Sequence, residues 1–245
     1  MKILAIEASG PVAGCAVLED GLLTADYNVQ YKKKHSQSLV PMMDEVRRML
    51  ELDLRTVDAI AIARGPGSFT GLRIGAATAK GAAMAMDRPV IPVPTVDSIA
   101  YNLYGTEGLI CPMMDARRQQ VYTGIYAWTR EDGIPRFQVL RPQCVVPVDE
   151  IAADLNERGR EVIFLGDGVP VYREALAGLM QVPFSFAPAH LARQRAAAVA
   201  ALAYALWQDQ GQACMVSADE FRPEYLRLAQ AEQEHSERRN FSLLL

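Results

Sequence analysis

Residues 58–75 read DAIAIARGPGSFTGLRIG, so a short apolar run leads directly into a glycine-rich turn. The run has the length and composition of a buried strand. Gly65 and Gly67 allow backbone conformations that other residues avoid, and Ser68 can cap a following helix. The stretch therefore predicts a strand, a tight loop and a helix, which together form a building unit of an α/β fold.

The residues on either side complete a βββαβαβ order in the first half of the chain. The expected elements are strands at 2–8, 14–18 and 22–30, a helix at 36–52, a strand at 58–63, a helix at 72–86 and a strand at 90–93. The Asp20-Gly21 step between apolar runs is a strong hairpin signal. The first helix carries its apolar residues at helical spacing on one face, which predicts packing against a sheet.

The second half repeats this order in pattern, although hardly in identity. The expected elements are strands at 109–114, 120–129 and 136–141, a helix at 148–158, a strand at 161–165, a glycine turn at 166–168 and a helix at 169–180. We therefore expect an α/β fold of two similar lobes, which an internal repeat of this kind indicates. The first lobe would span 1–104 and the second 105–217, the latter including a long helix at 189–209. The tail 218–245 would pack back on the first lobe, with a flexible end.

Composition indicates an ordinary globular protein. The chain has 245 residues, of which 50% are hydrophobic, and a net charge of −4, which gives no overall attraction to nucleic acid. The apolar run 196–206 is shorter than a membrane span requires, and no secretory signal is recognisable, so we expect a cytoplasmic protein. The cysteines are far apart and form no Cys-x-x-Cys pair, which predicts buried free thiols. They are Cys15, Cys111, Cys144 and Cys214.

The glycine loop leaves two interpretations open. Backbone N–H groups of Gly65, Gly67 and Ser68 can face an anion at the start of a helix, which would make a weak, vestigial phosphate loop. The same residues also suit a strand-to-helix turn that binds nothing.

Several motifs, taken together, resemble one family. They are ILAIEAS at 3–9, HSQSLVP at 35–41, GPGSFTGLRIG at 65–75, VPTVDSIA at 93–100, MMDARRQQVY at 113–122 and FRPEYLR at 221–227. In this order, and over nearly the whole chain, they resemble the TsaB (YeaZ-type) family. The resemblance implies two ribonuclease H-like lobes of the actin, sugar kinase and heat-shock ATPase superfold (ASKHA). It also implies a paralogue of TsaD, the catalytic subunit that makes threonylcarbamoyladenosine on tRNA.

On this resemblance the chain is a non-catalytic partner subunit. Its expected partners are a TsaD-type subunit, a TsaE-type ATPase and, when the protein is alone, a second copy, with tRNA reached only through the complex. The metal-binding His-x-x-x-His pair of TsaD is replaced by Thr95 and Ile99, so no metal and no catalytic residue is expected. Glu7 and Pro11 weaken the first-strand loop that holds magnesium and phosphate in the superfold's ATPases. We expect no required cofactor, although ATP or ADP could lie at a shared interface; the alternative is an active ATP-dependent phosphotransferase or ATPase.

The helix at 72–86 is built from small residues, which let another backbone approach closely. Residue types alone leave open whether that backbone belongs to its own lobe or to a partner. The resemblance implies pairing through the two helices of the first lobe. The interface residues expected on this basis are Leu39, Met42, Met43, Val46, Arg73, Gly75, Ala79, Ala82 and Met86. Ala79→Arg would then abolish pairing and leave the monomer folded.

Two charged stretches also have two interpretations each. The basic run 32–35 is either a solvated loop or a surface that faces RNA. The stretch 115–122 brings Asp115, Arg117 and Arg118 to a strand end near the expected cleft, where they form either an internal ion pair or a contact to a ligand.

Overall fold

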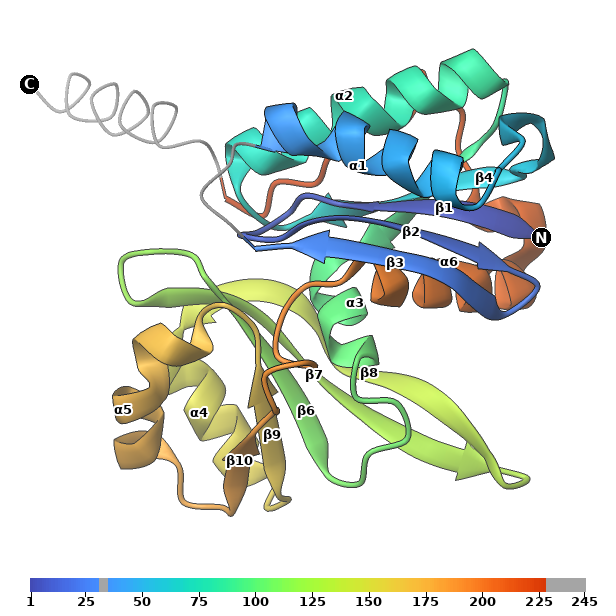
Figure 1. The fold of residues 1–245 in the computed structure, drawn as a ribbon. Helices are drawn as coiled ribbons and strands as arrows, with labels where there is room; N and C mark the ends of the chain where they lie inside the picture. The colour runs from blue at the N-terminus through green and yellow to red at the C-terminus, as the bar shows by residue number, and fades with distance from the viewer. Residues whose placement is uncertain (31–34, 228–245) are drawn as a thin grey trace, which may run out of the picture.

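The computed structural model describes residues 1–30 and 35–227, and it contains two five-stranded sheets with helices on their faces (Figure 1). Each sheet is built from a βββαβαβ segment, so the predicted duplication is confirmed. The basic run at 32–34 and the end of the predicted tail lie outside the described residues.

The first sheet has the strand order β3-β2-β1-β4-β5. Its strands are β1 (Lys2–Glu7), β2 (Ala13–Glu19), β3 (Leu22–Val29), β4 (Ala59–Gly65) and β5 (Val90–Pro94). β1 lies between an antiparallel partner, β2, and a parallel partner, β4. Both β1 and β4 are nearly continuous apolar runs because helices cover both of their faces. Helices α1 (His35–Met49) and α2 (Phe69–Met86) cover one face, and α6 (Ala196–Gln210) covers the other.

The second sheet has the order β10-β9-β6-β7-β8. Its strands are β6 (Leu109–Asp115), β7 (Gln120–Glu131), β8 (Ile134–Pro147), β9 (Val162–Leu165) and β10 (Phe184–Phe186). Read in the other direction, β8-β7-β6-β9-β10, this order repeats the order β3-β2-β1-β4-β5 of the first sheet. Helices α4 (Val148–Glu157) and α5 (Val169–Leu179) cover its outer face.

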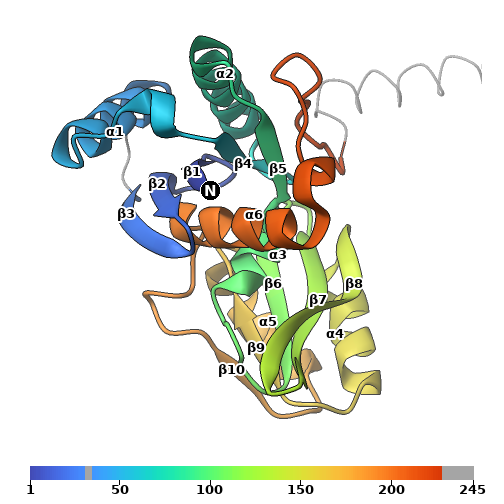
Figure 2. The same cartoon turned by 90° about the vertical axis from the view of Figure 1, so that its right-hand side faces the viewer.

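Two helices lie between the sheets, as Figures 1 and 2 show. α3 (Thr95–Tyr101) packs its apolar residues against β6 and β7 of the second sheet, and it also contacts α6. α6 packs against β1 and β2. Short 3-10 turns, η1 (Leu54–Thr56) and η2 (Gly211–Cys214), complete the described elements. The chain therefore crosses between the lobes more than once, and this holds the lobes together.

The placement of α6 corrects the sequence boundary, which assigned all of 105–217 to the second lobe. α6 packs on the first sheet because its alanines allow close approach to the alanine-rich face of β1, β2 and β4. Further along the chain, Phe221 is buried in the core beneath α1 and α2. The sequence also missed α3 and the three-residue strand β10, because both are too short to show a periodic pattern.

The four cysteines are free thiols, as predicted. Cys15 and Cys111 are buried, whereas Cys144 and Cys214 are partly exposed. Among the described residues, no helix has both the length and the apolar character that crossing a membrane requires.

Candidate functional site

The glycine loop joins β4 to α2 and packs directly against the end of β1. Ser68 caps α2, because its side chain accepts a hydrogen bond from the N–H of Gly71. A Cβ atom at Gly67 would lie 2.2 Å from the Ser9 carbonyl oxygen. Only glycine therefore allows this contact between the two loops.

Several N–H groups of this loop already have partners inside the protein. Ser68 N donates to Ser9 O at 2.7 Å, and Gly65 N donates to Thr95 Oγ1 at 3.0 Å. Gly65 also has a φ of 125° and lies against the backbone of Glu224. These contacts account for Gly65, Gly67 and Ser68 as packing residues, and they favour the turn over the phosphate loop.

We expect Gly67→Ala to destabilise the fold by roughly 2–4 kcal/mol, because the methyl group must push two backbone segments apart. Gly81→Ala in α2 is the matched control, since a Cβ atom there meets nothing within 4 Å. That substitution should stabilise the helix by about 0.5–1 kcal/mol. Urea unfolding of both variants measures the difference. Equal stability of the two variants would contradict the packing role of Gly67.

A buried polar cluster lies where β1 ends, on the side that faces the second lobe. Both the backbone N–H and the hydroxyl of Ser9 donate to Glu7 Oε1. Glu7 and Ser9 are fully buried, and Glu7 Oε2 has no hydrogen-bond partner among the described residues. The pKa of Glu7 is raised to about 7, mainly because the carboxyl group is buried. The hydrogen bonds from Ser9 lower this pKa, and the negative charge of the nearby Asp167 contributes to raising it.

Gln194 fills the space between this cluster and the glycine turn of the second lobe. Its Nε2 donates to Asp167 Oδ1 at 2.8 Å, and the side chain is 1% exposed. A Cβ atom at Gly10 would lie 2.4 Å from the same Nε2. Gln194 therefore bridges the loop that follows β1 and the glycine turn of the second lobe.

The raised pKa of Glu7 predicts a pH dependence of stability. Because the folded protein holds the proton more tightly than the unfolded chain, whose value is near 4.5, the free energy of unfolding should fall between about pH 4.5 and 7. The total loss attributable to Glu7 is roughly 3 kcal/mol. Glu7→Gln cannot titrate, so its stability relative to the unchanged protein should rise over this range. Urea unfolding at pH 5, 6, 7 and 8 measures this difference, and a constant difference would contradict the raised pKa.

The two positions that the sequence resemblance matches to the TsaD histidines serve packing. Thr95 and Ile99 are both fully buried, and Thr95 ties the glycine loop to α3. Within residues 1–30 and 35–227, no group of three or more His, Cys, Asp or Glu side chains could hold a metal ion.

The outer side of α1 and α2 is the second candidate site. The interface residues expected here fall into a buried group and a more exposed group. The side chains of Leu39, Met42, Val46 and Ala79, together with Gly75, are buried toward the first sheet, so they present little surface to a partner, although Val46 also lines the groove described below. Each is held in the core of its own lobe. Met43, Ala82 and Met86 are partly buried, and Arg73 is exposed.

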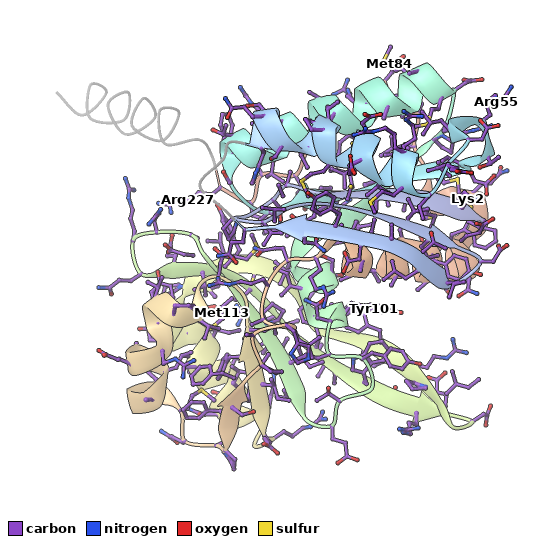
Figure 3. All side chains as sticks on the ribbon, in the orientation of Figure 1. Lys2, Arg55, Met84, Tyr101, Met113 and Arg227 are labelled. Carbon is purple, nitrogen blue, oxygen red and sulfur yellow. The ribbon has the colours of Figure 1, made fainter. Side chains whose placement is uncertain are left out.

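A groove of about 210 Å³ between the two helices is the feature that sequence reasoning missed. Its lining residues are Leu4, Val40, Met43, Asp44, Val46, Arg47, Leu52, Leu54, Ala82, Ala85 and Met86. Val40 is 60% exposed, and Met84 near the end of α2 is 66% exposed and points away from the sheet (Figure 3). Both helices carry apolar residues on more than one face, so their spacing did not reveal which face is outside. We call the exposed part of this groove and its rim the α1–α2 face.

The similarity of this chain to known proteins covers both lobes. The chain matches the family described as TsaD: tRNA N6-adenosine threonylcarbamoyltransferase, over residues 29–235. It is 33% identical over 232 residues to the tRNA threonylcarbamoyladenosine biosynthesis protein TsaB of Bacillus subtilis, with 95% of this chain and 96% of the relative covered. TsaB of Escherichia coli is 32% identical over 151 residues, which are 59% of this chain and 64% of that relative. The solved structure of YeaZ from Pseudomonas aeruginosa matches with a TM-score of 0.75 and 28% identity, covering 92% of this chain and 99% of that one.

Proposed function

The chain belongs to the TsaB family of tRNA threonylcarbamoyladenosine biosynthesis proteins, and from this premise we propose that it is a non-catalytic subunit that supports a TsaD-type transferase. In this role it contributes a docking surface and a rigid scaffold, while the threonylcarbamoyl transfer takes place on the partner.

The observation that carries this proposal is the contact of the buried Gln194 side chain with loops of both lobes. Gln194 lies against Gly10 and bonds to Asp167, so it takes up room beside the first-strand loop, which the sequence resemblance implies holds magnesium and phosphate in the superfold's ATPases. The neighbouring carboxyl group of Glu7 is fully buried and bonded to Ser9. Pro11 has no N–H group to offer a phosphate. These residues do not fit a bound nucleotide, so we derive no catalytic step for this cleft.

The α1–α2 face supports a role in protein pairing. Its groove is apolar along the floor and carries Asp44 and Arg47 among its lining residues, which matches the mix of apolar centre and polar rim found in protein interfaces. We propose that a TsaD-type subunit docks here, and that a second copy of this chain covers the face when the partner is absent. A TsaE-type ATPase would then join the assembled pair, and any ATP or ADP would lie at the shared surface rather than in this chain's own cleft.

Reconstitution tests the proposal. The purified chain alone should show no significant Mg-ATP turnover and should not modify tRNA. Mixed with a TsaD-type subunit it should elute as a 1:1 complex on sizing chromatography. Addition of a TsaE-type ATPase, ATP, tRNA and an activated threonylcarbamoyl donor, whose activating group leaves during the transfer, should then give modified tRNA. A robust ATPase rate of the isolated chain would favour the active phosphotransferase instead, and modification at the full rate without this chain would refute the subunit role.

A further inference from the structure

The turn between β6 and β7, residues 116–119, presents two arginines on an unusual backbone, and we call it the arginine hairpin. Arg117, Arg118 and Gln119 have φ angles of 64°, 53° and 59°, respectively. A left-handed conformation is uncommon for any residue other than glycine, and here it occurs at three successive positions. The local structure must therefore hold this turn in place.

Asp115 supplies much of that restraint. Its side chain accepts hydrogen bonds from Arg117 N at 2.8 Å and from Tyr172 Oη at 3.0 Å. On the other side of the turn, Val148 N donates to Gln119 O at 3.2 Å. The turn thus keeps Arg117 86% exposed in spite of its ion pair with Asp115, and Arg118 is exposed beside it.

Residues 221–227, which we call the tail strap, bring further groups to the hairpin. Arg227 donates a hydrogen bond to Ala116 O in the hairpin. Glu224 forms an ion pair with Arg64 at 2.9 Å and accepts a hydrogen bond from Gln143 at 2.9 Å, so it joins the strap to both lobes. Figure 3 shows Arg227 at the side of the molecule where the hairpin of the second lobe reaches the first lobe.

Two exposed aromatic rings continue this surface onto α2. Phe69 and Tyr225 have ring centroids 5.3 Å apart, and the guanidinium of Arg73 lies 3.9 Å above the Phe69 ring. The two residues are 38% and 40% exposed, respectively. Exposed rings beside arginines are the groups on which unpaired bases stack in proteins that bind single-stranded RNA.

Five arginines gather on this surface of a protein whose net charge is −4. Its cationic groups are Arg64, Arg73, Arg117, Arg118 and Arg227. Two of them are paired, with Glu224 and Asp115, and Asp149 follows Val148 just beyond the hairpin. Asp97 lies close to Arg64 and Glu224 but is partly buried, whereas Arg73, Arg118 and Arg227 form no ion pair within residues 1–30 and 35–227.

We propose that the arginine hairpin and the tail strap bind the tRNA in the assembled complex, with the guanidinium groups on phosphates and Phe69 or Tyr225 against an unpaired base. This inference rests on the proposed function, since it assumes that the assembly receives tRNA. A planar guanidinium group can donate two parallel hydrogen bonds to the oxygens of one phosphate. A rigid turn that holds arginines in place suits this geometry. The apolar α1–α2 face, in contrast, suits a protein partner, so the two surfaces have distinct chemistry.

The test measures tRNA affinity of the complex between this chain and a TsaD-type subunit, by fluorescence anisotropy at several salt concentrations. The double variant Arg117→Gln with Arg118→Gln should weaken binding by about tenfold for each arginine that binds a phosphate, near 0.1 M salt. The slope of log affinity against log salt should become less steep by about 2. Tyr225→Leu should weaken binding by about fivefold or more and leave the salt slope unchanged.

The matched control is the double variant Arg130→Gln with Arg136→Gln, which removes one charge from the far end of β7 and one from the adjoining start of β8. It should leave tRNA affinity within about twofold of the unchanged complex, as expected for charges about a Debye length or more away. Sizing chromatography of each complex shows whether pairing persists.

Unchanged affinity of the hairpin variant, or an equal loss in the control, would overturn the proposal and leave the proposed function intact. Dissociation of the complex itself would assign the hairpin to a protein interface and would also overturn it. Failure of the unchanged complex to modify tRNA would instead count against the proposed function.

Discussion

Ala79→Arg is expected to unfold the first lobe, with a loss of roughly 4 kcal/mol or more in the free energy of unfolding. Ala79 is fully buried in the core between α2 and the first sheet. A guanidinium at this site would lose its water without gaining a partner, and its volume would force α2 away from the sheet. The substitution therefore does not test partner binding, contrary to the expectation from sequence.

Ala77→Arg is the control for this prediction, because Ala77 lies two residues earlier on the same helix and is exposed. It adds the same charge and volume at the solvent side, so its stability should stay within about 0.5 kcal/mol of the unchanged protein. Circular dichroism during urea titration measures both variants. A cooperative, native-like transition for Ala79→Arg would show that α2 packs differently from its place in this structure.

Val40→Arg is expected to abolish pairing with a TsaD-type subunit while the monomer stays folded. Val40 is 60% exposed and lines the groove on the α1–α2 face. A charge placed in an apolar docking groove must be desolvated on binding, so we expect at least a roughly 100-fold rise in Kd. Ala85→Arg, on the opposite wall of the groove, should have the same effect.

The control for pairing is Val171→Arg on α5, because Val171 is equally exposed at 59% but lies in the second lobe. Isothermal titration calorimetry with the partner, combined with thermal unfolding of each free variant, separates binding from folding. If Val40→Arg bound normally and Val171→Arg did not, the docking surface would be on the second lobe.

The repeat explains why so much of the fold could be predicted. Hairpins, glycine turns and helix caps are local features, and the same order of them occurs in both halves of the chain. The position of α6 could not be predicted in this way. α6 is apolar around most of its surface, so its residue pattern does not single out one buried face, and only the presence of a matching alanine-rich sheet face decides where it packs.

The candidate sites show the same division. Sequence identified the glycine loop and the two helices of the first lobe, but it could not say which groups have partners. Ser68 N is bonded to Ser9 O, and these two residues are far apart in the chain. Gln194 was not singled out by any motif, since its role depends on lying between Gly10 and Asp167.

The sequence by itself determined the family, the two-lobed α/β order and the absence of the TsaD histidine pair at Thr95 and Ile99, because these follow from residue identity and local pattern. Only the tertiary structure decided that Ala79 is core and Val40 is surface, and that the arginine hairpin meets Arg227. The physical reason is that burial and pairing are set by which distant segments pack together. When a helix has apolar residues on several faces, its sequence does not determine which face packs against the sheet.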